Sequence, residues 1–237
     1  AGLLAVREVG RHRRLEMWAI CGLLAGAALL MKQTALLALL PERGIDVEGL
    51  DLVQFHGVSW NGVADRLLEL FPTLATDSLS LAADIEARFH VVFESRPPDL
   101  IPGAVVAFAA AARVFPGAAT IVTGSEARSV ELLLERAGLR QICTGYTSCD
   151  QYSRSKPDPE SYLLAARRLD VPPASCLVFE DSLPGLQAAS AAGMWRIAIT
   201  RGVPARVRQA AELAHAGIDD FTALPEAFFD SIALPGG

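Results

Sequence analysis

The spacing of hydrophobic and polar positions changes along the chain. Between residues 44 and about 102, apolar residues recur three and four positions apart, which is typical of amphipathic helices. From residue 103 onward, short apolar runs alternate with helical patterns. The apolar runs cover residues 119–122, 176–179 and 195–199, and the helical patterns cover residues 104–114, 126–137, 159–169 and 184–192. We therefore expect a small helical module and a separate region of alternating strands and helices.

This alternation predicts the fold class. Strands that alternate with helices favour an α/β fold with a doubly wound parallel sheet, because the crossover helices cover both faces of the sheet. Ligands of such sheets bind beyond the carboxyl ends of the strands. Candidate chemistry is therefore sought just after the apolar runs.

The first 40 residues leave more than one interpretation open. A basic stretch, Arg11 to Arg14, precedes an apolar run of 15 residues from Met17 to Met31. A membrane-spanning helix needs about 20 uninterrupted apolar residues, and a signal peptide would show a small-residue cleavage site, which is not evident here. We favour a buried strand over residues 18–24 followed by a helix that ends at Gly44, with a signal or anchor as the alternative.

Composition narrows the class of partner. The chain has 237 residues, 51% of them hydrophobic, and a net charge of −6, which together exclude intrinsic disorder. Phosphate backbones need clustered cations, so we expect a small molecule and no nucleic acid. The four cysteines are irregularly spaced and form no C-x-x-C pair, which favours reduced thiols in the cytoplasm.

The charge is unevenly distributed. The first 45 residues hold six Lys and Arg but three Glu and no Asp, and the first aspartate of the chain is Asp46. The predicted first strand and its surroundings therefore contain no aspartate.

Two motifs favour an anion site. Thr123, Gly124 and Ser125 follow an apolar run and open a helix, so a hydroxyl and backbone N–H groups can surround an anion there, although such residues also serve as ordinary helix N-caps. Lys156 begins the string K-P-D-P, in which two prolines restrict the backbone. A lysine held in a stiff loop is a candidate counter-charge for phosphate.

A third motif favours a metal ion. The run of residues 176–179 ends in the adjacent carboxylates Glu180 and Asp181. Buried carboxylates are costly unless they are paired or bind a hard cation such as Mg²⁺. The alternative is that Asp181 caps the next helix.

Together the strings V-T-G-S, K-P-D-P and F-E-D-S, with A-A-S-A-A-G-M after them, resemble the haloacid dehalogenase superfamily, in its branch of β-phosphoglucomutases and phosphoglycolate phosphatases. The resemblance implies a Rossmann-like core of residues 1–34 and 103–237 with an inserted helical cap domain of residues 35–102. It implies catalytic and phosphate-binding roles for Thr123 and Lys156, with Gly124 and Ser125 also at the phosphate. It further implies that Asp181 and Glu180 bind Mg²⁺.

The family's first motif, D-x-D-G, supplies the attacking aspartate and the acid/base, and it is absent here. In the alignment with the other motifs, Gly22 stands at the nucleophile position and Leu24 at the acid/base position. The cap segment also lacks an early cation, which leaves His56, Trp60 and Asn61 as candidate substrate contacts.

We therefore expect one of two functions. The resemblance implies a Mg²⁺-dependent phosphatase of small phosphorylated metabolites, of the sugar phosphate class, whose missing nucleophile makes this chain inactive, a pseudoenzyme. The alternative is a non-catalytic protein of the same fold that binds a phosphorylated ligand. In either case we expect a cytoplasmic monomer or homodimer and no membrane partner.

Overall fold

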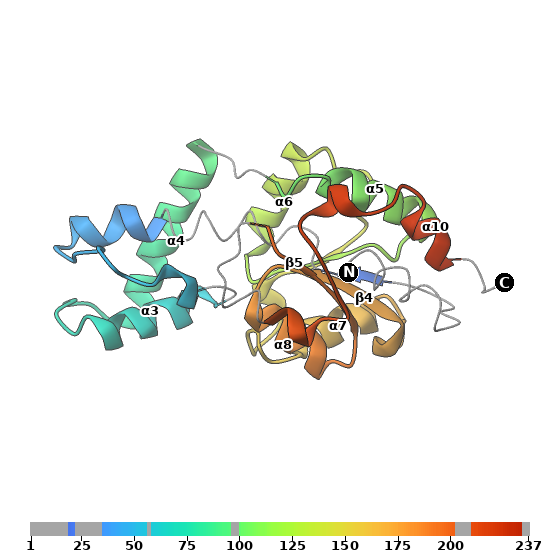
Figure 1. Ribbon diagram of the computed structural model, residues 1–237. Coiled ribbons are helices and arrows are strands. Elements are labelled where there is room, and N and C mark those ends of the chain that lie inside the picture. Colours follow the sequence, from blue (N-terminus) through green and yellow to red (C-terminus); the bar gives the residue numbers. More distant parts are fainter. Residues whose placement is uncertain (1–18, 22–34, 56–57, 96–99, 202–209, 234–237) are drawn as a thin grey trace. The chain divides into compact units, whose positions relative to one another are not determined.

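The computed structural model describes residues 19–21, 35–55, 58–95, 100–201 and 210–233 (Figure 1). These residues form two compact units. One unit joins residues 19–21 to residues 100–233, and the other spans residues 35–95.

The first unit is built on parallel strands. β1 (Ala19–Cys21), β4 (Cys176–Glu180), β5 (Trp195–Ile199) and β6 (Ala216–Ile218) form one sheet in the order β1-β4-β5-β6. β2 (Ile121–Val122) pairs with β3 (Tyr146–Thr147) in a second ladder. Every pairing among these strands is parallel, with Cys21 of β1 opposite Val178 of β4. All the strands of a parallel ladder run in the same direction, so the carboxyl ends of β1 and β4 lie at the same edge.

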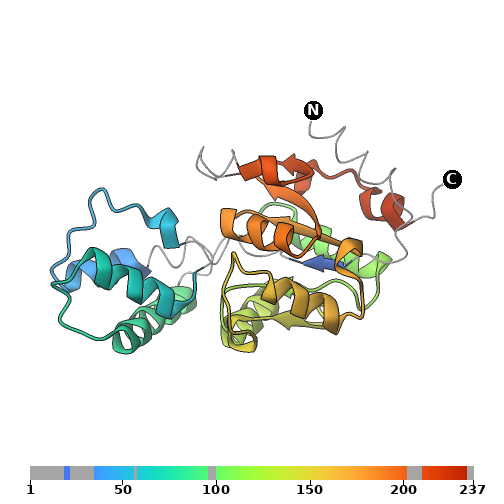
Figure 2. The same ribbon diagram turned by 90° about the horizontal axis from the view of Figure 1, so that it is seen from below.

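Helices cover both faces of the strands. In Figure 1, α5 (Ala104–Val114), α6 (Ala127–Arg136) and α10 (Phe228–Ala233) lie on one side, and α7 (Glu160–Arg168) and α8 (Leu183–Ala191) lie on the other. Figure 2, seen from below, shows α7 and α8 in front of the strands. The predicted doubly wound α/β fold is confirmed. Short 3₁₀ helices connect these elements, at Cys149–Gln151, Pro173–Ser175, Ala210–Leu213 and Phe221–Ala223.

Strand β4 divides the interior into two cores. All five of its residues are buried, and successive side chains of a strand point to opposite faces. Leu177 and Phe179 pack in the core that α5, α6 and α10 cover. Cys176 and Val178 pack in the other core, together with Tyr162 of α7. The sequence of β4 is therefore continuously apolar up to Glu180, because both faces of the strand are covered.

The second unit is helical. Residues 35–42 are helical, and α3 (Trp60–Leu70) packs against α4 (Ser78–Ser95), with the short 3₁₀ helix Leu52–Phe55 before them. Ser59 caps α3 by accepting a hydrogen bond from Gly62 N at 3.2 Å. The rings of Trp60 and Phe89 lie 5.0 Å apart between centroids in the core of this unit.

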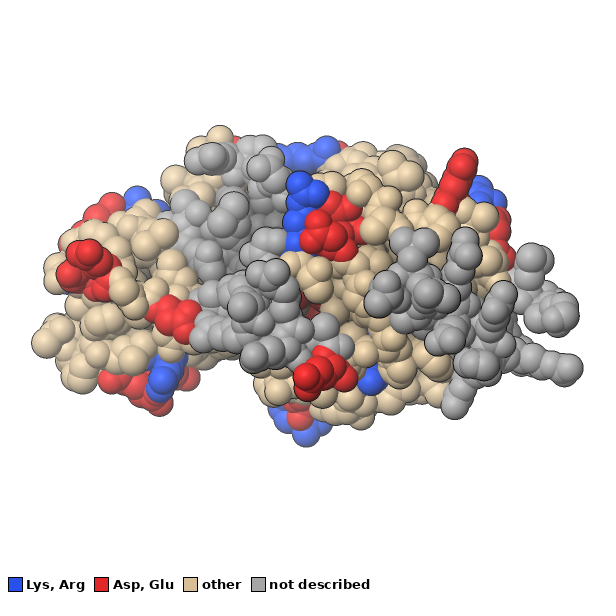
Figure 3. Space-filling view, in the orientation of Figure 1, with Lys and Arg blue, Asp and Glu red and all other residues tan. Residues whose placement is uncertain are grey.

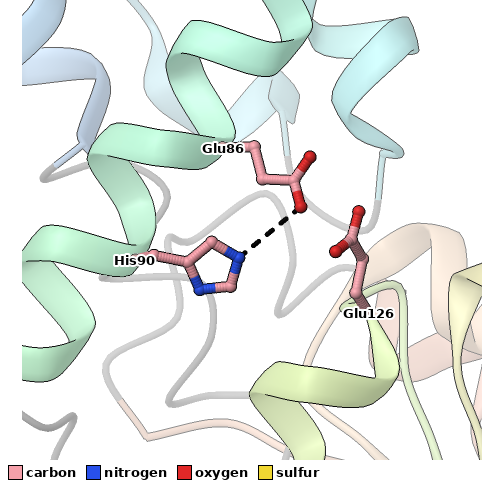
Figure 4. A group of neighbouring side chains, drawn as sticks. All are labelled: Glu86, His90 and Glu126. Atoms are coloured by element: carbon pink, nitrogen blue, oxygen red, sulfur yellow. Dashed lines mark ion pairs between the residues drawn. The ribbon is translucent and has the colours of Figure 1, made fainter.

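Ion pairs reinforce this unit at its surface. Arg43 pairs with Asp84, and Glu42 pairs with Arg88, so both pairs join the end of the first helix to α4. Figure 4 shows a further pair within α4, where His90 Nε2 lies 3.5 Å from a carboxylate oxygen of Glu86, one turn away. Glu126, also drawn there, belongs to the other unit and precedes α6.

Charged side chains on the exterior are interspersed. On the described part of the face in Figure 3, Lys and Arg side chains lie beside Asp and Glu side chains. Pairs such as Arg113 with Asp230, 2.7 Å apart, neutralise cations locally. In the described part of the chain, no helix combines the length and apolar character needed to cross a membrane.

The predicted elements largely match the observed ones. The expected helix 104–114 and strand 195–199 coincide with α5 and β5, and the other predicted helices of this unit differ from the observed ones by one residue at each end. Strands β3 and β6 and helix α10 were not predicted. The expected strand over residues 18–24 contains β1, whereas the rest of the segment up to residue 34 lies outside the described residues.

We expect Phe179→Ala to lower the free energy of unfolding by about 3–5 kcal/mol. The ring is fully buried, and its centroid lies 5.2 Å from that of Phe221 and 6.4 Å from those of Phe228 and Phe229. Urea unfolding followed by circular dichroism measures the change. Val106→Ala in α5 is the control, because Val106 is 74% exposed, and equal losses in the two variants would contradict this assignment of the core.

Candidate functional site

Two strand ends and one loop carry the predicted site residues. Thr123 follows β2, Glu180 ends β4, and Asp181 comes directly after it. Lys156 lies in the loop before α7 and is buried, with its side chain 3% exposed. Its Nζ lies 3.5 Å from the carbonyl oxygen of Val122, the last residue of β2. The structure therefore brings Lys156 to the ends of both strands.

The buried ion pair of Lys156 and Glu180 is the centre of this site. Lys156 Nζ donates to Glu180 Oε2 at 2.8 Å, and the Glu180 side chain has no exposed surface. The hydroxyl of Tyr162 donates to the same oxygen at 2.6 Å and lies 3.2 Å from Lys156 Nζ. A buried charge is costly unless it is paired and hydrogen-bonded, and both conditions are met here.

The second oxygen of Glu180 is also occupied. Glu180 Oε1 accepts from the backbone N of Asp181 at 3.2 Å and from the backbone N and Oγ of Ser182 at 3.1 and 2.8 Å. Ser182 Oγ in turn accepts from Gly185 N at 3.1 Å and so caps α8. Protein donors thus face each oxygen of Glu180. This arrangement favours a role for Glu180 in holding Lys156, while its predicted role as a metal ligand stays a prediction.

Gly185 makes room for this carboxylate. A Cβ at position 185 would overlap the Glu180 side chain at its Cδ, Oε2 and Cγ atoms. Glycine at this point of α8 is therefore a steric requirement of the site.

The two adjacent carboxylates have opposite pKa shifts. Burial by itself would raise the pKa of Glu180, but the charge of Lys156 and the hydrogen bonds of Lys156, Tyr162 and Ser182 hold it below its usual value. Burial raises the pKa of Asp181, and the neighbouring charge of Glu180 raises it further. Asp181 is thus the carboxylate of the pair whose negative charge is poorly compensated.

Asp181 is the residue of this site that fits a metal ion. It is 8% exposed, it adjoins a second carboxylate, and no ion pair joins it to a cation within the described residues. Mg²⁺ binds through carboxylate oxygens and keeps several of its waters. The donor chemistry and the uncompensated charge at Asp181 therefore both suit this ion.

The loop after β2 is fixed from several directions. Thr123 N donates to Thr147 O at 2.9 Å, and Ser125 N donates to Thr123 Oγ1 at 3.0 Å. The hydroxyl of Tyr152 donates to Thr123 O at 3.0 Å. Among the described residues, none of the hydrogen bonds uses the N–H of Gly124. Because Thr123 Oγ1 accepts from Ser125, its own proton is left to donate, so this hydroxyl and the Gly124 amide are the donors that remain for an anion.

The candidate substrate contacts in the other unit have different positions. Trp60 is buried against Phe89, which favours a role in the core of that unit, whereas Asn61 is exposed on α3. His56 lies outside the described residues, as do Gly22 and Leu24.

Sequence reasoning missed Tyr162, Tyr152, Ser182 and Gly185. A signal existed for Tyr162, because it occupies the apolar side of a short helix, and a buried tyrosine hydroxyl usually finds a hydrogen-bond partner. Gly185 gave no such signal, since the pattern along the chain does not show which side chain lies opposite a glycine.

Comparison with known proteins assigns this chain to a family. A family model of haloacid dehalogenase-like hydrolases matches residues 29–193. This chain belongs to the haloacid dehalogenase-like hydrolase family. Fructose-1-phosphate phosphatase YqaB of Escherichia coli is 46% identical to it over 72 residues, which are 30% of this chain and 38% of that protein. The family's sugar phosphate phosphatases are thus among the relatives of this chain, although the matched part spans well under half of that relative's length.

Solved structures of the family agree in fold. β-Phosphoglucomutase of Clostridium difficile has a TM-score of 0.76 at 17% identity, over 92% of this chain and 97% of that one. CbbY of Rhodobacter sphaeroides, solved in complex with xylulose-(1,5)bisphosphate, has a TM-score of 0.69 at 26% identity, over 91% of this chain and 99% of that one. The resemblance to the haloacid dehalogenase superfamily, inferred from the motifs, is confirmed, and the fold agrees with that of a β-phosphoglucomutase.

We expect Gly185→Ala to destabilise the first unit by about 1–3 kcal/mol, because the added methyl group forces Glu180 away from Lys156. Gly145→Ala is the matched control, since a Cβ at position 145 would meet no atom within 4 Å and its backbone has no positive φ. Urea midpoints of the two variants check the difference. A Gly185→Ala midpoint equal to that of Gly145→Ala would show that Glu180 has room to move.

Proposed function

We propose that this chain binds a small phosphorylated metabolite of the sugar phosphate class together with Mg²⁺, and that it does not transfer the phosphoryl group. The observation that carries the proposal is the buried cluster of Lys156, Glu180 and Asp181 at the ends of β2 and β4. In this proposal Lys156 supplies the cation for the anion, and Asp181 supplies the carboxylate for the metal. The aspartate that would attack phosphorus is missing from the sequence, where no Asp precedes Asp46.

The proposed anion site uses three donors. The donors are the ammonium of Lys156, which lies 3.5 Å from the last carbonyl of β2, and the Thr123 hydroxyl and Gly124 N–H that follow this strand. Ser125 is a further candidate beside them. Phosphoryl groups are bound largely by such fixed donors and positive charges. The sugar phosphate class is supported by the named activity of the Escherichia coli relative.

The charge of the cluster links the anion to the metal. With all three groups ionised, Lys156 supplies one positive charge, and Glu180 and Asp181 supply two negative charges, so in that state the cluster would repel a phosphate dianion. When Mg²⁺ is bound, it neutralises negative charge on the phosphate oxygens and reverses this balance. We therefore propose that Asp181 holds Mg²⁺ and that phosphate binds well only when the metal is present.

Covalent phosphoryl transfer needs a nucleophile at the end of β1. The segment that leaves β1 carries Gly22 and Leu24 where the family has its two aspartates, and it has no Asp or Glu before Glu42. Glycine and leucine side chains can neither attack phosphorus nor move a proton. We further propose that residues 35–102, most of whose described part belongs to the helical unit, correspond to the family's cap domain.

We expect the chain to release no phosphate from fructose 1-phosphate or p-nitrophenyl phosphate above a protein-free blank in the presence of Mg²⁺, as measured by a colorimetric phosphate assay. Turnover that disappears in Asp181→Asn would contradict the proposal and favour a phosphatase with another nucleophile. Gly22→Asp combined with Leu24→Asp restores the two aspartates of the family's motif, and phosphate release by this variant would support the alignment of the first strand.

We expect saturating Mg²⁺ to tighten the binding of inorganic phosphate by roughly 10-fold or more, within the usual range of coupling between two sites. Isothermal titration calorimetry gives the affinity for phosphate with Mg²⁺ and with a chelator, and the ratio of the two affinities is the quantity compared. In Asp181→Asn the ratio should approach one, because the metal ligand and the excess negative charge are both removed. Asp230→Asn, at an exposed ion pair with Arg113, is the control and should retain the full ratio. Equal ratios in the two variants would refute the role of Asp181.

A further inference from the structure

We infer that Tyr162 is a positioning residue that fixes the ammonium of Lys156 for the bound anion. This inference rests on the proposed function, because it concerns the same anion site. Nothing in the motif strings marks Tyr162, which lies six residues after Lys156 in the first turns of α7.

The geometry around Lys156 Nζ carries the inference. The Tyr162 side chain is fully buried, and its hydroxyl gives its proton to Glu180 Oε2 at 2.6 Å. The oxygen of that hydroxyl therefore offers a lone pair to Lys156 Nζ, 3.2 Å away. Nζ also lies 4.8 Å from the centre of the Tyr162 ring, within the range of a cation–π contact. A single side chain thus contacts both members of the ion pair.

These contacts decide which N–H of the ammonium can donate a hydrogen bond to an anion. An ammonium has three protons, and Lys156 directs them toward Glu180 Oε2 at 2.8 Å, the Tyr162 hydroxyl at 3.2 Å and Val122 O at 3.5 Å. The two shorter contacts anchor the group. The longest and weakest contact is the one beside Thr123, so the proton in that direction is the one that a phosphate oxygen can take over.

Without the hydroxyl, the ion pair would be less well fixed. A lysine side chain is a flexible stem that carries a point charge, and only the contact with Glu180 Oε2 and the weak contact with Val122 O would remain. In Tyr162→Phe, Lys156 would lose one acceptor and Glu180 one donor, while the ring would still fill its place in the core with Val178 and Ala165. We therefore expect the substitution to loosen the orientation of the ammonium and to reduce the packing of the core only slightly.

The test compares two binding constants of the full chain. We expect Tyr162→Phe to weaken the binding of inorganic phosphate at saturating Mg²⁺ by roughly 3- to 10-fold, the equivalent of one hydrogen bond. The affinity for Mg²⁺ alone, measured without phosphate, should change less than about twofold, because Asp181 is not a partner of Tyr162. Calorimetry gives both constants, and thermal unfolding checks the fold.

Tyr146→Phe is the matched control. Its hydroxyl donates to Glu131 of α6 at 2.9 Å and not to the site, so both affinities should equal those of the unmodified chain. A phosphate affinity of Tyr162→Phe that equals that of the unmodified chain would overturn the inference and leave the proposed function standing. A parallel loss of phosphate and Mg²⁺ affinity, or a variant that does not fold, would overturn it as well, since the hydroxyl would then be a structural requirement. If the unmodified chain itself binds no phosphate, the proposed function fails and the inference with it.

Discussion

The buried ion pair between Lys156 and Glu180 is the constraint on which the rest of this site depends. Each partner is an ionised group taken almost fully out of water, so neither is tolerable alone. The surrounding groups follow from that condition. Tyr162 and Ser182 provide donors for the carboxylate, Gly185 leaves the space for it, and β4 brings it to the edge of the sheet where β1 also ends.

The division of the interior into two cores explains how one short strand can serve both stability and chemistry. Phe179 points into the core under α5 and α10, whereas the next side chain, Glu180, points to the side of α7. Strand alternation thus places an aromatic anchor and an ionised carboxylate on adjacent residues. The position of the carboxylate is therefore tied to the packing of the whole sheet.

Much of this architecture could be predicted from the sequence, and the failures have identifiable causes. The helix 104–114 and the strand 195–199 have patterns long enough to reveal their period, whereas β3 has only two residues and β6 is three residues with a glycine in the middle. The motifs also located Thr123, Lys156, Glu180 and Asp181 near strand ends. They could not show that the oxygens of Glu180 face protein donors, because that depends on contacts across the fold from α7 and α8.

The contrast between Glu180 and Asp181 bears on how this site came to persist in a chain that lacks the D-x-D-G motif. Lys156 and Glu180 hold each other in place, so the need to fold is sufficient to explain their presence. Asp181 has no such support, since burial and the adjacent charge both disfavour its ionised form. Under the proposed function, a neutral residue at this position would stabilise the metal-free fold and lose the cation, so Asp181 marks a conflict between folding and binding.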